Sequence, residues 1–302
     1  MSLTVIMAMP ITPSDFAFSR CSFVLCDPVF IPPAYAIYCH SLMQTVTQLF
    51  RLDGRTALIT GGSRGLGEEM AQGLAEAGAN VYIVARREKW LLPAIDSLRA
   101  AGAKCAGSVC DVSDQEQVKA TVRLAAEAFG PVDILVNNAG ATWGAPAEDM
   151  PLDKWQSVIA TNLTGSFLFS QECARGMIAR RYGRIINVAS IAGLRGSLPR
   201  GIHCSGYVAA KGGLIALTRE LACKWAQYNI RVNAIAPGFF PTRMTEGVLP
   251  HLMEDLKQNV PLGRPGRDGE IKGVAVFLAS DASNYVTGQT LAVDGGSTAV
   301  TV

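Results

Sequence analysis

Short apolar runs alternate with longer segments of helical periodicity from residue 55 almost to the end of the chain. The apolar runs predict strands at residues 56–60, 80–85, 104–110, 133–137, 184–189, 231–236 and 290–293. The segments between them predict helices at residues 66–77, 90–101, 114–129, 153–180, 207–228 and 268–279. Strands that alternate with helices form parallel sheets with right-handed crossovers. The pattern therefore predicts one doubly wound α/β domain, with a seven-stranded parallel sheet and helices on both faces.

Residues 1–50 differ in composition from the rest, because they are rich in proline and cysteine and almost uncharged. The prolines and the polar residues near position 45 argue against a membrane span. No basic region precedes the first apolar residues, which argues against a secretory signal, and arginine is too rare for a transit peptide. We expect residues 1–50 to be an extension, disordered or absent from the native protein, with Met43 as a possible true start. Residues 51–302 then form the folded domain.

Net charge and cysteine usage limit the partners that the chain can have. The formal net charge is +2, and both signs are spread along the sequence, so we expect no nucleic-acid and no membrane partner. The eight cysteines form no C-x-x-C pair and the chain has three histidines, so we expect no metal site. Reduced, buried cysteines would suit a cytoplasmic protein.

A glycine-rich turn, residues 60–67, joins the first predicted strand to the first predicted helix. Its candidate nucleotide-binding residues are Gly61, Ser63, Arg64, Gly65, Leu66 and Gly67. Glycines let the backbone approach a pyrophosphate, and the helix N-terminus offers free N–H groups to the anion, as in Rossmann-type domains. Glu68 and Glu69 stand where an ATP or GTP phosphate loop needs lysine and serine or threonine.

The same turn also matches the G-x-S-x-G elbow of hydrolases, with Ser63 at the nucleophile position. His203 and His251 follow later in the chain, so this motif alone leaves a hydrolase open. The helix that begins with a third glycine favours the dinucleotide interpretation.

The end of the second predicted strand bears on the choice of coenzyme. NAD-preferring sites place Asp or Glu there, whereas this chain has Arg86 and Arg87, and Arg64 adds a third cation from the glycine turn. Guanidinium groups suit a ribose 2′-phosphate because they form bidentate, charge-assisted hydrogen bonds. We therefore expect NADP(H) rather than NAD(H).

Tyr207 and Lys211 lie four residues apart, on one face of a predicted helix. A nearby cation lowers the pKa of a phenol, which is about 10 in free tyrosine. Lowering this pKa to about 7 requires ~4 kcal/mol, which we assign to Lys211 and an oxidised nicotinamide ring together. Such a tyrosine could exchange a proton with a substrate oxygen near neutral pH.

In combination these motifs resemble the short-chain dehydrogenase/reductase family over about residues 52–298. Further positions that match the family's coenzyme and substrate motifs are Asp111, Val112, Asn138, Ala139, Gly140, Asn162, Ser190, Pro237, Gly238 and Thr242. The resemblance implies that Asp111 binds the adenine, and that Val112 and residues 138–140 contact the coenzyme. It also implies that Thr242, in the segment that begins with Pro237 and Gly238, touches the nicotinamide amide.

The resemblance further implies an oxidoreductase that moves hydride between the nicotinamide and a carbonyl carbon. Ser190 would bind the substrate oxygen, Tyr207 would exchange the proton, and Lys211 would hold the nicotinamide ribose. Asn162 would anchor a proton relay. The stretch between Ser190 and Tyr207 is longer than in most family members, which leaves the shape of the substrate pocket open.

The substrate is the least constrained part of the prediction. Residues 141–149, 181–193 and 237–242 resemble the gluconate 5-dehydrogenase branch, so we expect a keto-sugar acid such as 5-ketogluconate as the small-molecule substrate. Arg195, Arg200 and Arg243 are the candidate partners of its carboxylate, and residues 248–260 are expected to form a helical lid. Two alternatives remain, a 3-oxoacyl-acyl-carrier-protein reductase and a catalytically inactive nucleotide-binding scaffold. Family members suggest a homotetramer or homodimer.

Overall fold

The structure, a computed structural model, describes residues 44–196, 201–247 and 249–300. The predicted extension lies outside the described residues up to residue 43, and it stays a prediction. The compact unit that holds the domain begins at Thr45, slightly before the expected boundary at residue 51. A single helical turn, α2 (Val46–Leu49), opens this unit and is capped by the Thr45 side chain. No helix in the described part of the chain is both long and apolar enough to cross a bilayer.

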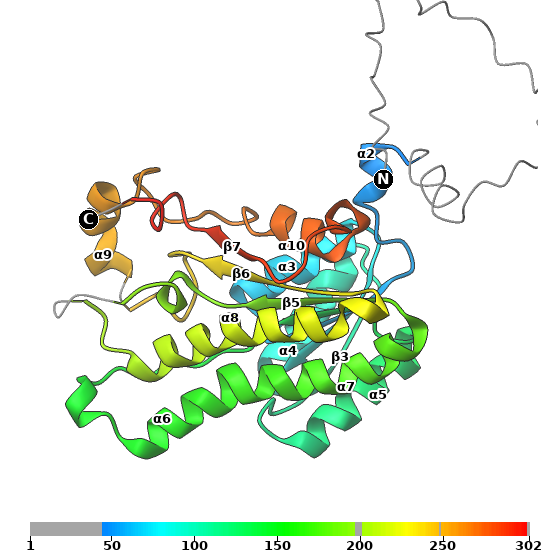
Figure 1. Cartoon of the computed structure of the whole chain (residues 1–302), viewed down its shortest axis with the longest axis horizontal. Helices are drawn as coiled ribbons and strands as arrows, with labels where there is room; N and C mark the ends of the chain where they lie inside the picture. The colour runs from blue at the N-terminus through cyan, green and yellow to red at the C-terminus, as the bar shows by residue number, and fades with distance from the viewer. Residues whose placement is uncertain (1–43, 197–200, 248, 301–302) are drawn as a thin grey trace, which may run out of the picture. The chain divides into compact units, whose positions relative to one another are not determined.

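Seven parallel strands form the predicted sheet (Figure 1), in the order β3-β2-β1-β4-β5-β6-β7. The strands are β1 (Thr56–Thr60), β2 (Asn80–Ala85), β3 (Cys105–Val109), β4 (Ile134–Asn137), β5 (Gly183–Val188), β6 (Ile230–Pro237) and β7 (Thr290–Val293). The predicted bounds of β1, β2 and β7 are confirmed, and the other predicted strands differ by one residue at one or both ends. Parallel strands covered on both faces are apolar throughout, which is why continuous apolar runs identified them.

Helices cover both faces of the sheet, as predicted. The helices are α3 (Gly65–Glu76), α4 (Glu88–Ala100), α5 (Gln115–Phe129), α6 (Leu152–Ile159), α7 (Gly165–Arg180), α8 (Ser205–Trp225), α9 (Leu249–Asn259) and α10 (Lys272–Ala279). Alternate residues of β1 face opposite cores: Ile59 packs with α3, α4 and α10, and Leu58 packs with α5, α7 and α8. The strands are therefore held between two separate apolar layers.

Most predicted helices differ from the structure by one to three residues at their ends, and two differ by more. The helix expected at residues 153–180 is divided into α6 and α7 by one π-helical turn, η3 (Ala160–Thr164). The helix expected from residue 268 begins only at Lys272, because Gly269 adopts a left-handed φ of 85° that interrupts the helical path. The Gly269 N–H donates instead to the Glu69 carboxylate at 2.7 Å, which ties this turn to α3.

The strand order reverses beside β1, which pairs with β2 on one side and with β4 on the other. In open α/β sheets the crevice for a ligand lies at such a point, outside the carboxyl ends of the strands. The segments that follow β1, β4, β5 and β6 carry most of the predicted site residues. The fold therefore brings residues from distant parts of the sequence to one edge of the sheet.

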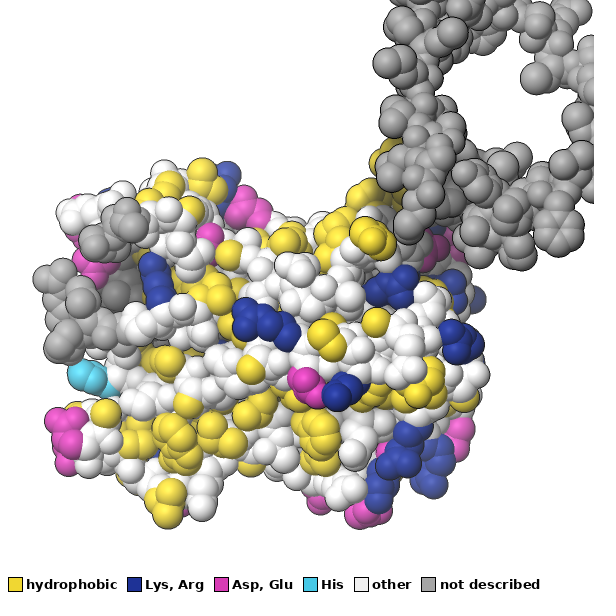
Figure 2. Space-filling model, viewed as in Figure 1, with side chains coloured by type: hydrophobic (Ala, Val, Ile, Leu, Met, Phe, Trp, Pro, Cys, Tyr) yellow, Lys and Arg dark blue, Asp and Glu magenta, His cyan; other side chains and the backbone are white. Residues whose placement is uncertain are grey.

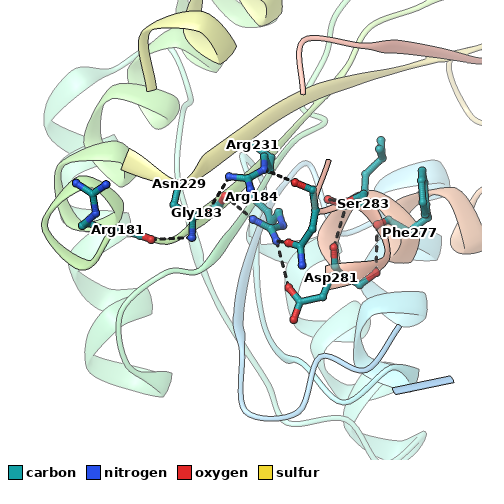
Figure 3. Close-up of polar contacts among 11 residues, drawn as sticks. Arg181, Gly183, Arg184, Asn229, Arg231, Phe277, Asp281 and Ser283 are labelled. Atoms are coloured by element: carbon teal, nitrogen blue, oxygen red, sulfur yellow. Dashed lines mark hydrogen bonds and ion pairs between the residues drawn. The ribbon is translucent and has the colours of Figure 1, made fainter. Parts of the chain in front are cut away.

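The opposite edge of the sheet holds a buried cation (Figure 3). Arg184, near the start of β5, is 1% exposed and lies 3.2 Å from a carboxylate oxygen of Asp281. Its guanidinium also donates to the side-chain oxygen of Asn284 and to the Gly183 carbonyl. Burial lowers the pKa of Arg184. These contacts attach β5 to the turn that follows α10.

Candidate active site

A cavity of about 500 Å³ opens at the carboxyl edge of the sheet. Nearly all the predicted site residues line it: Gly61, Ser63, Arg64, Gly65, Leu66, Gly67, Arg86, Arg87, Asp111, Val112, Asn138, Ala139, Gly140, Ser190, Tyr207, Lys211, Pro237, Gly238 and Thr242. Asn162 is the exception, because its side chain is buried behind the cavity wall. The fold therefore assembles the predicted nucleotide-binding and catalytic residues in one cavity.

The glycine turn is shaped by contacts with the segment after β4. Gly61 has a φ of 64°, and a Cβ there would lie 2.9 Å from Cα of Ala139. The Asn138 side chain donates to the carbonyls of Thr60 and Gly61, both at 3.0 Å. The Thr60 hydroxyl accepts from the backbone of Asn138 at 3.0 Å. Asn138 therefore fixes the backbone of the glycine turn through hydrogen bonds, in addition to lining the cavity.

The adenosine end of the predicted nucleotide site carries several cations. Arg86 is close enough to lower the pKa of the Asp111 carboxyl, although hydrogen bonds from Ser113 are the main cause of that lowering. Burial lowers the pKa of Arg64, and the positive charges of Arg243 and Arg87 lower it further. A guanidinium whose neighbours are also cations is stabilised by an anion, so this donor set fits the 2′-phosphate of NADP(H).

Tyr207 and Lys211 meet at the other end of the cavity, one helical turn apart on α8. The Lys211 Nζ lies 5.5 Å from the centroid of the Tyr207 ring and donates to the Val188 carbonyl at 2.6 Å. The Ser190 side chain is close enough to the phenol to lower its pKa. Three of the four predicted catalytic residues, Ser190, Tyr207 and Lys211, thus line the same cavity.

The acidity of Tyr207 differs from the expectation. Burial raises the pKa of Tyr207 above its usual value, and the neighbouring Ser190 side chain offsets only part of this effect. Burial also lowers the pKa of Lys211 to about 8, so the amine is still charged at neutral pH and loses its proton just above it. The lysine by itself therefore does not acidify the phenol, and the positive charge of an oxidised nicotinamide would have to supply that effect.

Asn162 occupies the π turn that separates α6 from α7. Its amide donates to the carbonyls of Ala141 and Val158, both at 2.8 Å, and its Oδ1 accepts from the Ala141 N–H at 3.3 Å. A Cβ on Gly140 would lie 2.9 Å from this Oδ1 and 3.9 Å from the Lys211 Nζ. Asn162 and Lys211 therefore both border the space beside Gly140, although Asn162 does not reach the cavity surface.

Two of the three arginines predicted as carboxylate partners lie in the described part of the chain, and each has other contacts. Arg195 donates to the backbone and side-chain oxygens of Ser297, both at 2.7 Å, so it secures the C-terminal segment instead. Arg243 lines the cavity near Arg64, at the predicted adenosine end. Arg200 lies outside the described residues.

Sequence reasoning missed several cavity residues. They are Val84, Ala85, Trp90, Cys110, Ala141, Thr161, Val188, Ala189, Phe240, Met244 and Thr245. Most are apolar or small residues next to predicted positions. Trp90 carries a signal that could have been used, because it follows the Arg86-Arg87 pair in the first turn of α4. Within the described ranges, no group of three or more His, Cys, Asp and Glu side chains is arranged to hold a metal ion.

This fold and cavity define an oxidoreductase of the dinucleotide-binding α/β class, and sequence comparison identifies the family. A family profile described as Enoyl-(Acyl carrier protein) reductase matches residues 61–298. The chain belongs to the short-chain dehydrogenase/reductase family, as predicted, and this assignment replaces the hydrolase alternative. The prediction that the chain is an enzyme is confirmed, because its relatives are oxidoreductases of the same family.

Two curated relatives represent the two predicted branches. Gluconate 5-dehydrogenase of Gluconobacter oxydans is 40% identical over 253 residues, which cover 83% of this chain and 97% of the relative. The 3-oxoacyl-acyl-carrier-protein reductase of Chlamydia muridarum is 42% identical over 246 residues, covering 81% of this chain and 98% of the relative. Sequence identity therefore does not separate the two activities.

Solved structures share the fold over nearly their whole length. A gluconate 5-dehydrogenase from Burkholderia cenocepacia, in complex with NADP and tartrate, is 40% identical with a TM-score of 0.80, covering 85% of this chain and 100% of that one. A short-chain type dehydrogenase/reductase from Mycobacterium marinum is 37% identical with a TM-score of 0.81, again covering 85% and 100%. Actinorhodin polyketide ketoreductase with NADPH is 34% identical with a TM-score of 0.76, covering 80% and 97%.

Proposed function

We propose that the protein interconverts a ketone and a secondary alcohol with NADP(H), and that the ketone is a keto-sugar acid such as 5-ketogluconate. The observation that carries the proposal is that Ser190, Tyr207 and Lys211 line the same cavity as the glycine turn and the arginine cluster. The coenzyme prediction is confirmed by structural relatives that hold NADP or NADPH. In this chemistry the nicotinamide supplies or accepts the hydride.

The proposed roles of the side chains follow from their positions. The Ser190 hydroxyl binds the substrate oxygen and keeps it next to the phenol of Tyr207. Tyr207 donates its proton to that oxygen during reduction and accepts it during oxidation. Because burial raises the pKa of Tyr207 above its usual value, the phenol keeps the proton that it donates during reduction. Lys211, one helical turn from Tyr207, holds the nicotinamide ribose. The buried Asn162 anchors the proton relay.

Sugar acids and acyl thioesters make different demands on the cavity. Arg195 and Arg243 are placed away from Ser190, so neither supplies a cation for a substrate carboxylate at that end. The alternative, a 3-oxoacyl thioester, needs no such cation, and the 42% identity to a 3-oxoacyl-acyl-carrier-protein reductase favours it as the second candidate. The Gluconobacter and Burkholderia relatives favour the sugar acid.

The proposal is tested by following NADPH oxidation with 5-ketogluconate, an acetoacetyl thioester and a neutral diketone. We expect 5-ketogluconate to give the highest kcat/KM, and preference for the thioester would transfer the proposal to the second candidate. The Tyr207→Phe variant serves as the control, because it removes the hydroxyl that carries the exchangeable proton and keeps the ring. We expect its kcat to fall by about 10²–10⁴-fold with NADPH binding unchanged. Full activity of this variant would refute the role of Tyr207.

We also propose that the protein is a cytoplasmic homotetramer or homodimer that associates through α7 and α8. Figure 2 shows hydrophobic side chains along these two helices on the face turned to the viewer. A shallow groove there is lined by Leu163, Phe167, Leu217 and Glu220, and Phe167 is 38% exposed. Light scattering after gel filtration tests this, and Phe167→Glu is expected to dissociate the assembly. A monomeric wild type would refute it.

A further inference from the structure

We propose that Arg243 joins Arg64 and Arg87 in binding the 2′-phosphate of NADP(H), and that the ring of Trp90 holds Arg243 in place for this contact. The inference rests on the proposed use of NADP(H). The sequence predicted that the segment after β6 contacts the nicotinamide through Thr242. The inference gives this segment a second role, in selecting NADP(H) over NAD(H). The other predicted role of Arg243, as a partner of a substrate carboxylate, is replaced.

Trp90 lies at the centre of a cluster of cations. It is in the first turn of α4, lines the cavity and is 36% exposed. The guanidinium carbon of Arg64 is 4.7 Å from the ring centroid, and that of Arg243 is 5.7 Å away. Cations at such distances are attracted to the face of an indole ring. One ring thus gathers arginines from the glycine turn and from the segment after β6.

The backbone brings these two arginines together. A Cβ on Gly65 would lie 3.3 Å from the Cγ2 methyl of Thr242, so the glycine turn and the segment after β6 are in near contact. Arg64 and Arg243 each lie one residue from this contact, on the same side of the cavity as Trp90. The Thr242 turn is itself fixed, because the Thr245 hydroxyl accepts from the Thr242 N–H at 2.9 Å and donates to the Phe240 carbonyl at 2.6 Å. Arg243 therefore extends from an ordered turn.

The charges of this cluster are not balanced by the protein. Among the residues that the structure describes, no carboxylate lies within ion-pair distance of Arg64, Arg87 or Arg243. Arg86 differs, because the Asp111 carboxylate lies near it. Three guanidinium groups held together without an anion repel one another, and a phosphate dianion would turn this repulsion into attraction. The 2′-phosphate is the part of NADP(H) that NAD(H) lacks, so the cluster acts on the difference between the two coenzymes.

Trp90 contributes by restricting the arginine side chain. A free arginine has many rotamers, and ordering it on binding costs affinity. The cation–π contact with an indole ring in the first turn of α4 keeps the guanidinium near its binding position before the coenzyme arrives. Removing the ring should therefore weaken phosphate binding even though the indole itself forms no hydrogen bond with the phosphate.

The test uses adenosine 2′,5′-bisphosphate and 5′-AMP as probes, because they differ in the 2′-phosphate and contain no nicotinamide. Dissociation constants are measured by calorimetry for the wild type, Arg243→Met and Arg243→Lys. We expect Arg243→Met to weaken the bisphosphate by about tenfold, equivalent to ~1.4 kcal/mol, and to change 5′-AMP by less than about twofold. Arg243→Lys should be intermediate, because it keeps the charge and loses the bidentate geometry.

A matched control and a double variant sharpen the result. Lys89 also lies over the Trp90 ring, with its Nζ 5.1 Å from the centroid, but it does not line the cavity. Lys89→Met removes the same charge from the same ring, and we expect it to change the bisphosphate constant by less than about threefold. Trp90→Leu should weaken the bisphosphate, and combining it with Arg243→Met should weaken it by less than the product of the two effects.

The possible outcomes separate this inference from the proposal on which it rests. If the wild type binds the bisphosphate no better than 5′-AMP, the preference for NADP(H) fails and the inference fails with it. If the wild type prefers the bisphosphate and Arg243→Met does so equally, the inference alone is overturned. Equal weakening of both probes by Arg243→Met would also overturn it, because Arg243 would then support the segment and not bind the phosphate.

Discussion

Asn137 and Asn187 face each other across the centre of the sheet, in register on β4 and β5, and the Asn137 amide donates to the Asn187 side-chain oxygen at 2.9 Å. Both side chains are buried. Asn137 also donates to the Ser170 hydroxyl on α7, and Asn187 donates to the Thr218 hydroxyl on α8, both at 2.9 Å. The pair therefore joins the two strands to the two helices behind the active site.

Asn187→Leu should destabilise the protein by about 2 kcal/mol, because the variant leaves buried polar groups of Asn137 and Thr218 without one partner each. For a domain of this size, the Tm should fall by about 4–8 °C. Thermal unfolding followed by circular dichroism measures this. Ser157→Ala on the exposed side of α6 is the control and should leave the Tm unchanged. An Asn187→Leu variant as stable as the wild type would contradict a role for the pair.

Gly140→Ala should reduce activity, because the added methyl would lie 2.9 Å from the Asn162 Oδ1 and close to the Lys211 Nζ. Either the Asn162 side chain or the segment after β4 must move, and small displacements beside the reacting groups cost about 10²-fold in rate. Steady-state kinetics should therefore show a fall in kcat. Gly273→Ala in α10 is the matched control, since its Cβ meets nothing within 4 Å, and its activity should be unchanged. Equal activity of both variants would show that the space beside Gly140 is not used.

Sequence predicted the strands and the glycine turn well because their signals are local. The apolar residues of β1 are consecutive, and the glycines that permit the turn follow them directly. Both signals can therefore be read from neighbouring residues in the sequence. The π turn around Asn162 could not be predicted in the same way, because the helical pattern of apolar residues continues through it. Its cause is tertiary, since the Asn162 amide bonds to Ala141 in a distant loop.

The acidity of the site also depends on features that sequence does not contain. The spacing of Tyr207 and Lys211 predicted their proximity correctly, but the direction of the pKa shifts is set by how deeply α8 is buried. Trp90 and Arg243 illustrate the same limit. They are far apart in the chain, and only the close approach of Gly65 to Thr242 places them over one another.

The buried amine of Lys211 should make stability depend on pH in a predictable direction. Its pKa is lowered from 10.5 to about 8 by burial, so between these values the unfolded chain holds a proton that the folded chain has released. The free energy of unfolding of the protein therefore rises as the pH increases from about 8 to about 10.5, because the buried amine loses its charge. Below pH 8 the amine is charged in both states, and its burial destabilises the folded state by about 3 kcal/mol.

The comparison of Lys211→Met with the wild type isolates this effect from other titrating groups. The free energy of unfolding is measured with denaturant at pH 7, 8, 9 and 10, without coenzyme. The variant should exceed the wild type in this free energy by most at pH 7. The gain should shrink at each step above pH 8. A difference that stays constant across this range would mean that the folded and unfolded states hold the lysine proton equally.

Asp281→Asn should destabilise the edge of the sheet that lies opposite the active-site cavity. The variant leaves the buried Arg184 guanidinium without its carboxylate. Removing one partner of a fully buried pair costs about 3–5 kcal/mol, and since the Asp281 side chain is 36% exposed, we expect about 2 kcal/mol. The Tm should fall by about 4–8 °C. Glu127→Gln, which breaks the exposed pair with Arg123, is the control and should change the Tm little.

A second variant distinguishes a lost ion pair from lost packing. Adding Arg184→Met to Asp281→Asn removes the buried charge and keeps an apolar chain of similar length against the Tyr182 ring, whose centroid lies 5.0 Å from the Arg184 guanidinium. Replacing both partners with uncharged groups restores part of the stability that is lost when one charge is left buried alone. The double variant should therefore have a higher Tm than Asp281→Asn. A lower Tm would mean that Arg184 stabilises this edge through its bonds to Asn284 and Gly183, and that the carboxylate of Asp281 contributes little.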